Sequence, residues 1–217
     1  MDPQLLSSLW TATLETIYMV SVSAVLAALF GLPLGLLLVI AAPKGFLPNP
    51  ALYQGLGSVV NAGRSLPFII LLVAIIPLTR LIVGTTIGST AALVPLTLSA
   101  IPFYARVAET SLLEVDRGLV EAAESMGCSY WQVIAKVLIP EAVPSLVLGL
   151  TIMVISLIGY SAMAGVVGGG GLGDLAIRYG YQRFNTQVML ITVVLLIVLV
   201  QIVQWVGDAI ARQMRRR

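Results

Sequence analysis

Residues 121–140 read EAAESMGCSYWQVIAKVLIP and form the one charged, amphipathic segment of a chain that is otherwise strongly apolar. Just before this stretch, Asp116 can cap a short helix, and Gly127 can end it because glycine accepts the left-handed backbone of a C-cap. About ten residues give a helix of roughly 15 Å, which is too short to cross a bilayer. Glu121 and Glu124 offer carboxylates to a basic partner. The stretch therefore predicts a surface knob that meets a soluble protein.

A second helix is predicted directly after Gly127. Ser129, followed three residues later by Gln132, fits a capping box at the start of this helix. Pro140 is expected to stop the helix, because proline has no backbone N–H and its ring clashes with the preceding turn. The two short helices and their connecting turn are predicted to occupy residues 114–138.

The composition is that of an integral membrane protein. Of the 217 residues, 59% are hydrophobic and 10% are charged, whereas roughly a quarter of the residues of a soluble domain are charged. The chain has no histidine and one cysteine, Cys128, which excludes imidazole catalysis, histidine metal sites, cysteine clusters and disulfides within the chain. We therefore predict no catalytic residue and no metal. A net charge of +2 with scattered arginines argues against a nucleic-acid partner.

Five apolar segments are long enough to cross a bilayer, for which about 20 residues suffice. They are predicted at residues 16–43, 57–79, 86–112, 141–167 and 186–207. The predicted fold is therefore an all-α integral membrane protein with five transmembrane helices, and residues 1–217 form a single transmembrane domain. Within the first segment, the sequence GLPLG at residues 31–35 is expected to give either a kink or a close contact between helices.

Arg64 is predicted to lie inside the membrane zone. The strongly apolar core at residues 65–79 is short, so a spanning helix must also include residues before Arg64. An arginine at the centre of a spanning helix costs roughly 2.5–3.5 kcal/mol on insertion scales. Two interpretations stay open. Either the side chain snorkels to the lipid headgroups, or it faces a pore or a subunit interface.

The glycine run at residues 168–173 has the spacing G-x-G-x-x-G, which is also found in nucleotide-binding loops. No strand is predicted before it and no Lys-Ser or Lys-Thr pair follows it, so we reject nucleotide binding there. We expect a flexible outer loop, or else a hinge or wall of an outer gate. Residues 174–185 carry aromatic and basic side chains suited to a membrane-interface belt or to a docking surface.

The basic residues predict the orientation of the chain in the membrane. With five spans and residues 121–140 inside, nine lysines and arginines lie inside and three outside. Those inside are Lys44, Arg64, Arg106, Arg117, Lys136, Arg212, Arg215, Arg216 and Arg217, and those outside are Arg80, Arg178 and Arg183. By the positive-inside rule, the N-terminus is predicted outside and the C-terminus inside.

The pattern EAA-x3-G-x9-V-x-I-P at residues 121–140 resembles the EAA loop of the membrane permease subunits of bacterial ABC importers. The resemblance implies the type I importer permease fold, in which this loop forms short cytoplasmic coupling helices that sit in a groove of an ATP-binding subunit. That role is assigned to the residues that match the motif, which are Glu121, Ala122, Ala123, Gly127 and Pro140. Residues 61–72, NAGRSLPFIILL, are similar to the second span of methionine-import permeases.

The resemblance also implies partners and a substrate. The chain is expected in the bacterial inner membrane with a second copy of itself, two copies of an ATPase subunit that holds ATP and Mg²⁺, and an extracytoplasmic methionine-binding lipoprotein. No cofactor is expected on this chain, which lacks a phosphate-binding loop. The implied substrate is methionine in its D- and L-forms.

Alternatives to this function stay open. Within the same class, the solute could be another amino acid, a sulfonate or a phosphonate. Secondary transport without an ATPase is a further alternative, but ion-coupled carriers usually place an acid or a histidine deep in the membrane. The long uncharged runs of the first, third, fourth and fifth predicted spans offer none at mid-depth.

Arg64 and four residues of the fourth predicted span are candidates for lining a translocation pathway. The four are Ser156, Tyr160, Ser161 and Met163. Serine and tyrosine inside a span tend to face protein or a cavity and not lipid. The same side chains could instead hold neighbouring helices together.

Overall fold

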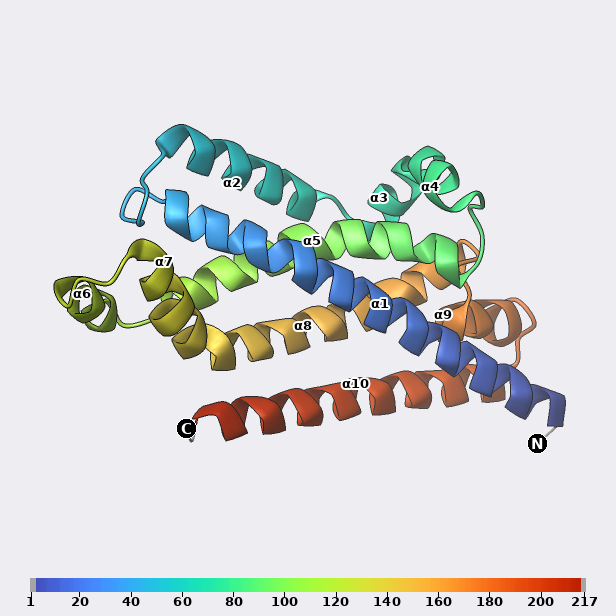
Figure 1. Cartoon of the computed structure of the whole chain (residues 1–217). Helices are drawn as coiled ribbons and strands as arrows, with labels where there is room; N and C mark the ends of the chain where they lie inside the picture. The colour runs from blue at the N-terminus through green and yellow to red at the C-terminus, as the bar shows by residue number, and fades with distance from the viewer. Residues whose placement is uncertain (1–2, 216–217) are drawn as a thin grey trace.

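The computed structural model describes residues 3–215, which form a bundle of helices (Figure 1). The α-helices are α1 Pro3–Ala41, α2 Pro50–Ser65, α3 Phe68–Ala74, α4 Ile76–Val83, α5 Ser89–Leu113, α6 Arg117–Ser125, α7 Tyr130–Val133, α8 Ile139–Val166, α9 Gly171–Leu175 and α10 Thr186–Arg215. Two π-helices, η1 at Ile134–Leu138 and η2 at Ala176–Tyr181, join α7 to α8 and extend α9. The described part of the chain contains no strand, so the all-α prediction is confirmed. Arg216 and Arg217 lie outside the described residues.

Four helical stretches are long and apolar enough to cross a membrane. They are Gln4–Ala41, Ser89–Leu113, Tyr130–Val166 and Thr186–Met214. Several of these helices are longer than the predicted spans. α1 begins well before residue 16, and α10 continues beyond residue 207. Helical hydrogen bonding does not require apolar side chains, so a helix can extend past the point where the apolar run ends.

The second predicted span is broken and is not a single helix. α2 and α3 meet at an angle of 100°, and α4 begins after a further break at Ile75. The bend lies at Leu66-Pro67, because a residue that precedes proline is pushed out of the helical region. Leu66 accordingly has an extended backbone, with φ −82° and ψ 125°. The prediction of one helix over residues 57–79 is therefore wrong, and α2 with α3 makes a fifth span only as a bent pair.

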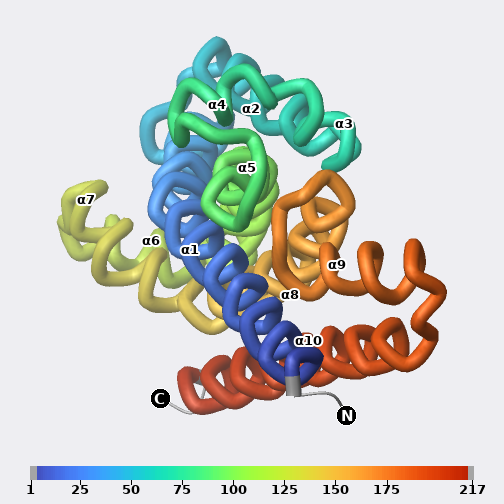
Figure 2. Tube along the Cα trace, turned by 90° about the vertical axis from the view of Figure 1, so that its right-hand side faces the viewer, coloured from blue at the N-terminus to red at the C-terminus, as the bar shows by residue number. Residues whose placement is uncertain are grey.

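α1 and α5 lie side by side and pack closely against each other (Figure 2). Gly31 lies against Ile101, and Gly35 lies against Ala105, so the contact advances in the same direction along both helices. A Cβ atom at Gly35 would lie 2.5 Å from the carbonyl oxygen of Ala105. Small residues allow helix backbones in a membrane to approach this closely. The close helix contact expected for residues 31–35 is confirmed.

The glycine run after α8 is packed and not exposed. Gly171 donates its N–H to the Glu15 carboxylate at 2.7 Å, and Leu172 donates to the Thr16 hydroxyl at 2.9 Å. Both bonds fix α9 to α1, and every residue of α9 is buried. The expected outer loop is therefore a short buried helix. Positive φ angles at consecutive glycines, which most side chains would not tolerate, fold the chain back onto α1.

The two ends of the bundle carry different elements (Figure 1). At one end lie α6, α7, the turn at residues 42–49 and the C-terminal end of α10. At the other end lie α4, α9 and the N-terminal end of α1. The knob predicted at residues 114–138 and the C-terminal end of α10 therefore lie at the same end.

Candidate functional site

The two short helices of the knob begin with the caps that the sequence indicates. The Asp116 carboxylate accepts a hydrogen bond from the Gly118 N–H at 2.7 Å and starts α6. Ser129 and Gln132 form a capping box at the start of α7, where the Ser129 N–H donates to the Gln132 side chain at 2.8 Å. Both caps satisfy donors that a helix N-terminus leaves free. Both predictions are confirmed.

Gly127 follows α6 in a left-handed conformation, with φ 82°. Its N–H donates to the Glu124 carbonyl at 2.9 Å, and the Cys128 N–H donates to the Ala123 carbonyl at 3.2 Å. This is a Schellman motif, which satisfies the carbonyls left free at a helix C-terminus. The prediction that Gly127 ends the first helix is confirmed, and its backbone sets the direction in which the chain leaves α6.

The helix that starts at Tyr130 does not stop at Pro140. α7, η1 and α8 follow one another without a gap, and Tyr130–Val166 is one helical stretch of 37 residues. The π-helical turn at Ile134–Leu138 lies directly before the proline. π-helical pairing is looser than α-helical pairing, and such a turn absorbs the missing N–H and the ring of Pro140. The predicted stop is therefore wrong, and the knob is joined directly to a membrane helix.

α6 projects from the bundle with most of its surface exposed (Figure 1). Ala123 faces inward and is buried, whereas Glu121 and Ala122 are exposed. Nearby, Met126 and Trp131 have exposed fractions of 77% and 71%. Exposed apolar side chains of this size suit a contact with another protein or with the headgroup region of a membrane.

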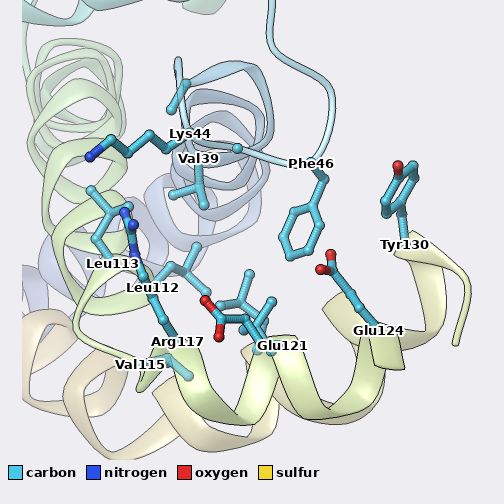
Figure 3. A pocket seen from close by; sticks show the side chains of 14 residues that line it. Val39, Lys44, Phe46, Leu112, Leu113, Val115, Arg117, Glu121, Glu124 and Tyr130 are labelled. Atoms are coloured by element: carbon cyan, nitrogen blue, oxygen red, sulfur yellow. The ribbon is translucent and has the colours of Figure 1, made fainter. Parts of the chain in front are cut away.

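A cleft of about 330 Å³ separates α6 from the turn at residues 42–49. Figure 3 shows the carboxylates of Glu121 and Glu124 beside this cleft, with the rings of Phe46 and Tyr130 close to Glu124. Within residues 3–215, neither carboxylate forms an ion pair. Lys44 and Arg117 also line the cleft without pairing with these acids, so both carboxylates stay available to a basic side chain of another protein.

A polar network around the buried Glu109 joins α2 to α5. The Arg106 guanidinium donates to the Glu109 carboxylate at 2.5 Å and to the Asn61 side chain at 2.8 Å. The Tyr53 hydroxyl donates to the other oxygen of Glu109 at 3.3 Å. Sequence reasoning missed this network, although the spacing of Arg106 and Glu109, three residues apart on one helix, was a signal for the ion pair.

The pathway candidates on α8 differ in their surroundings. The Ser156 and Ser161 hydroxyls both donate to carbonyls of their own helix, and Ser161 is buried. Tyr160 stacks on Phe68 of α3, with ring centroids 4.8 Å apart and planes at 6°. Met163 is 46% exposed. The structure thus brings Tyr160 to the bent span and leaves Met163 free to meet a solute or a partner.

The sequence also matches a known family. Residues 31–216 fit the pattern of the family described as binding-protein-dependent transport system inner membrane component. This chain belongs to that family. The binding-protein-dependent permeases are multi-pass transport components of the inner membrane and not enzymes. The predictions that this chain is a transport subunit and that it lies in the inner membrane are confirmed.

Similar proteins are permeases of methionine transport systems. The probable D-methionine transport system permease protein MetI of Vibrio cholerae is 56% identical over 209 residues, covering 96% of this chain and 93% of that protein. The methionine import system permease protein MetP of Bacillus subtilis is 43% identical over 212 residues, covering 98% and 96%.

Solved structures share the fold. A chain of the MetNI methionine ABC transporter in an inward-facing conformation matches with a TM-score of 0.96 at 47% identity, and each chain is covered to 99%. An amino acid ABC transporter chain matches with a TM-score of 0.78 at 19% identity, covering 97% of this chain and 94% of its own length, which shows likeness of fold alone. The predicted importer permease fold is confirmed.

Proposed function

We propose that this chain is the membrane-spanning subunit of an ATP-driven importer that carries methionine, in its D- and L-forms, across the inner membrane. The observation that carries this proposal is the agreement between two comparisons. Relatives that match almost the full length are methionine permeases, and a chain of a methionine ABC transporter superimposes over 99% of its length. The exposed knob supports the same function, because its exposed apolar side chains and its carboxylates, unpaired within the described residues, suit a contact with a separate ATPase subunit.

The partners are two copies of an ATPase subunit, which hold ATP and Mg²⁺, and an extracytoplasmic methionine-binding lipoprotein. In this proposal α6 sits in a groove of the ATPase, and Glu121, Ala122, Ala123 and Gly127 form the contact. Motion of the ATPase then reaches the membrane through α7, η1 and α8, because these form one helical stretch across Pro140.

The orientation follows from the end of the bundle that carries the knob. We place that end in the cytoplasm, which puts the N-terminus outside and the C-terminus inside. Lys44, Arg117 and Lys136 belong to the knob end, whereas Arg80 and Arg178 belong to the opposite end. This distribution supports the proposed orientation by the positive-inside rule.

A homodimer completes the pathway in this proposal. Five spans are few for enclosing a solute, and a second copy related by a twofold axis supplies a matching wall. The exposed Met163 and the stacked Tyr160 lie on the part of α8 next to the bent span, which supports this face as the pathway. The Ser156 and Ser161 hydroxyls are already bonded to carbonyls of α8, so they are less suited to bind a solute.

Uptake of methionine is expected to require ATP. The chain is reconstituted in vesicles with its ATPase and binding protein, and uptake of labelled D- and L-methionine is measured with ATP, without ATP and with a non-hydrolysable analogue. Uptake that persists without ATP would support secondary transport. Uptake of another amino acid, a sulfonate or a phosphonate in place of methionine would leave the class intact and change the solute.

Cross-linking tests the homodimer. In a Cys128→Ser background, Met163→Cys is expected to give a disulfide-linked dimer in the intact complex after mild oxidation, because this side chain is exposed. Met153→Cys is the matched control on the same helix, since Met153 is buried and should not reach a second copy. The readout is the dimer band on a non-reducing gel. A persistent monomer with Met163→Cys would count against a shared pathway at this face.

A further inference from the structure

Arg64 lies at half depth in the bundle and not at its inner end. The neighbouring residue Gly63 packs on Pro102, and a Cβ atom at Gly63 would lie 2.9 Å from the proline ring. Pro102 is near the middle of α5, Ser89–Leu113. Figure 1 shows α2 ending part-way along the bundle, where the chain bends into α3. The prediction that Arg64 belongs with the inner basic residues is therefore wrong.

The side chain of Arg64 is exposed, although it extends from the side of α2 that faces the bundle. Arg64 lies one helical turn after Val60, which is 1% exposed, and residues at this spacing share a face of the helix. Tyr53, on the same face, reaches Glu109 of α5. Charged side chains at this depth of a span almost always face the bundle interior or a water-filled cavity. By this rule we infer that Arg64, exposed on the bundle-facing side of α2, faces a solute pathway or a subunit interface and not lipid.

The described acids of this chain leave Arg64 without a carboxylate at its depth. Glu109 and Asp174 are held in ion pairs nearer the two ends of the bundle, and Glu15 accepts a backbone hydrogen bond at the outer end. The remaining described acids lie around the knob and at the inner ends of the long helices, and they are Glu114, Asp116, Glu121, Glu124, Glu141 and Asp208. A second copy related by a twofold axis along the membrane normal has the same groups at the same depths. It therefore brings none of these acids opposite Arg64.

We propose that Arg64 binds the carboxylate of the solute during its passage, so that the pathway favours solutes that carry such a group. This inference rests on the proposed function and names the part of the solute that this chain recognises. A guanidinium can hold a carboxylate through two parallel hydrogen bonds. The same positive charge also hinders the passage of inorganic cations. The solutes that this residue favours are therefore those with an anionic group, and for methionine that group is the carboxylate.

The test restores the charge chemically in the whole transporter. In the Cys128→Ser background, Arg64→Cys is expected to lower ATP-driven methionine uptake about tenfold or more, because a charge-assisted hydrogen bond is lost. Reaction with a water-soluble methanethiosulfonate that carries a quaternary ammonium should recover part of the uptake. The reagent of similar size that carries a sulfonate should not. Arg80→Cys is the matched control at the outer end, where loss of an exposed charge should change uptake by no more than about twofold.

Two conservative variants of Arg64, together with copurification of the ATPase, separate binding of the solute from a purely structural role of Arg64. Arg64→Lys keeps the charge and should retain more uptake than Arg64→Gln, while the amount of copurified ATPase stays unchanged in both. Among the conservative variants, the proposal is overturned if Arg64→Gln keeps wild-type uptake, if both variants lose uptake equally, or if either loses the ATPase. In the chemical test, it is overturned if both reagents rescue Arg64→Cys equally or if neither reagent reacts with it. If the wild-type transporter itself shows no ATP-dependent uptake, the proposed function fails, and that result is distinct from a failure confined to the Arg64 variants.

Discussion

Arg106→Leu is expected to lower the free energy of unfolding by about 2–4 kcal/mol, because it leaves a buried carboxylate without its cation. Glu109 is 3% exposed, and its ion pair with Arg106 is the charged centre of the network between α2 and α5. The substitution also removes the hydrogen bond to Asn61. For a chain of about this size, the midpoint of thermal unfolding should fall by roughly 5–15 °C. Thermal unfolding of the purified complex in detergent measures the change.

A double substitution separates the ion pair from side-chain packing. Arg106→Leu combined with Glu109→Leu removes both charges, and replacing a buried ion pair by apolar groups is often close to neutral. The double variant should therefore recover most of the lost stability. Arg80→Leu, which removes an exposed arginine, is expected to leave the midpoint almost unchanged. A double variant no more stable than Arg106→Leu alone would contradict the role given to Glu109.

Gly127→Val is expected to uncouple the ATPase from transport. Nothing lies within 4 Å of a Cβ atom at Gly127, so the substitution acts through its φ of 82° and not through a clash. A left-handed backbone costs a residue with a Cβ roughly 1–2 kcal/mol, which corresponds to a change of about 5–30-fold in an equilibrium. Relief of that strain turns α6 away from its orientation. ATPase copurification and ATP-driven uptake should fall together by about that factor.

Asparagine provides the matched control at the same position. Asn tolerates the left-handed conformation and is found at helix C-caps. Gly127→Asn should therefore keep most of the ATPase and most of the uptake. Equal losses in Gly127→Val and Gly127→Asn would show that the absence of a side chain matters, and not the backbone conformation.

Local hydrogen bonds made the knob predictable from the sequence. The caps at Asp116, Ser129 and Gly127 involve residues no more than a few positions apart, so the sequence alone contains both partners of each bond. The apolar runs likewise indicate the long helices, because their length is set by the thickness of a bilayer. Contacts between distant residues are different. Asn61 meets Arg106 across 45 positions, and no local pattern records that pairing.

The prolines show why the helix breaks were harder to predict. Pro67 lies at a bend of 100°, whereas the helix passes through Pro140 with a π-helical turn. The two residues have the same covalent restriction, and the outcome depends on whether the surrounding helices can satisfy the freed carbonyls. The half-depth position of Arg64 was hidden for the same reason, because it follows from the bend after α2 and the contact of Gly63 with Pro102.

The helical stretch from Tyr130 to Val166 has the proportions of a lever. It is roughly 55 Å long at 1.5 Å per residue, and Gly149, near its midpoint, is in tight contact with Val107 of α5. Gly207 of α10 packs tightly against Thr151 at almost the same level, so this helix is held near its midpoint between α5 and α10. If the ATPase displaces the α7 end as proposed, rotation of this helix about that contact moves its far end in the opposite direction. Such a rotation opens one side of the membrane as it closes the other.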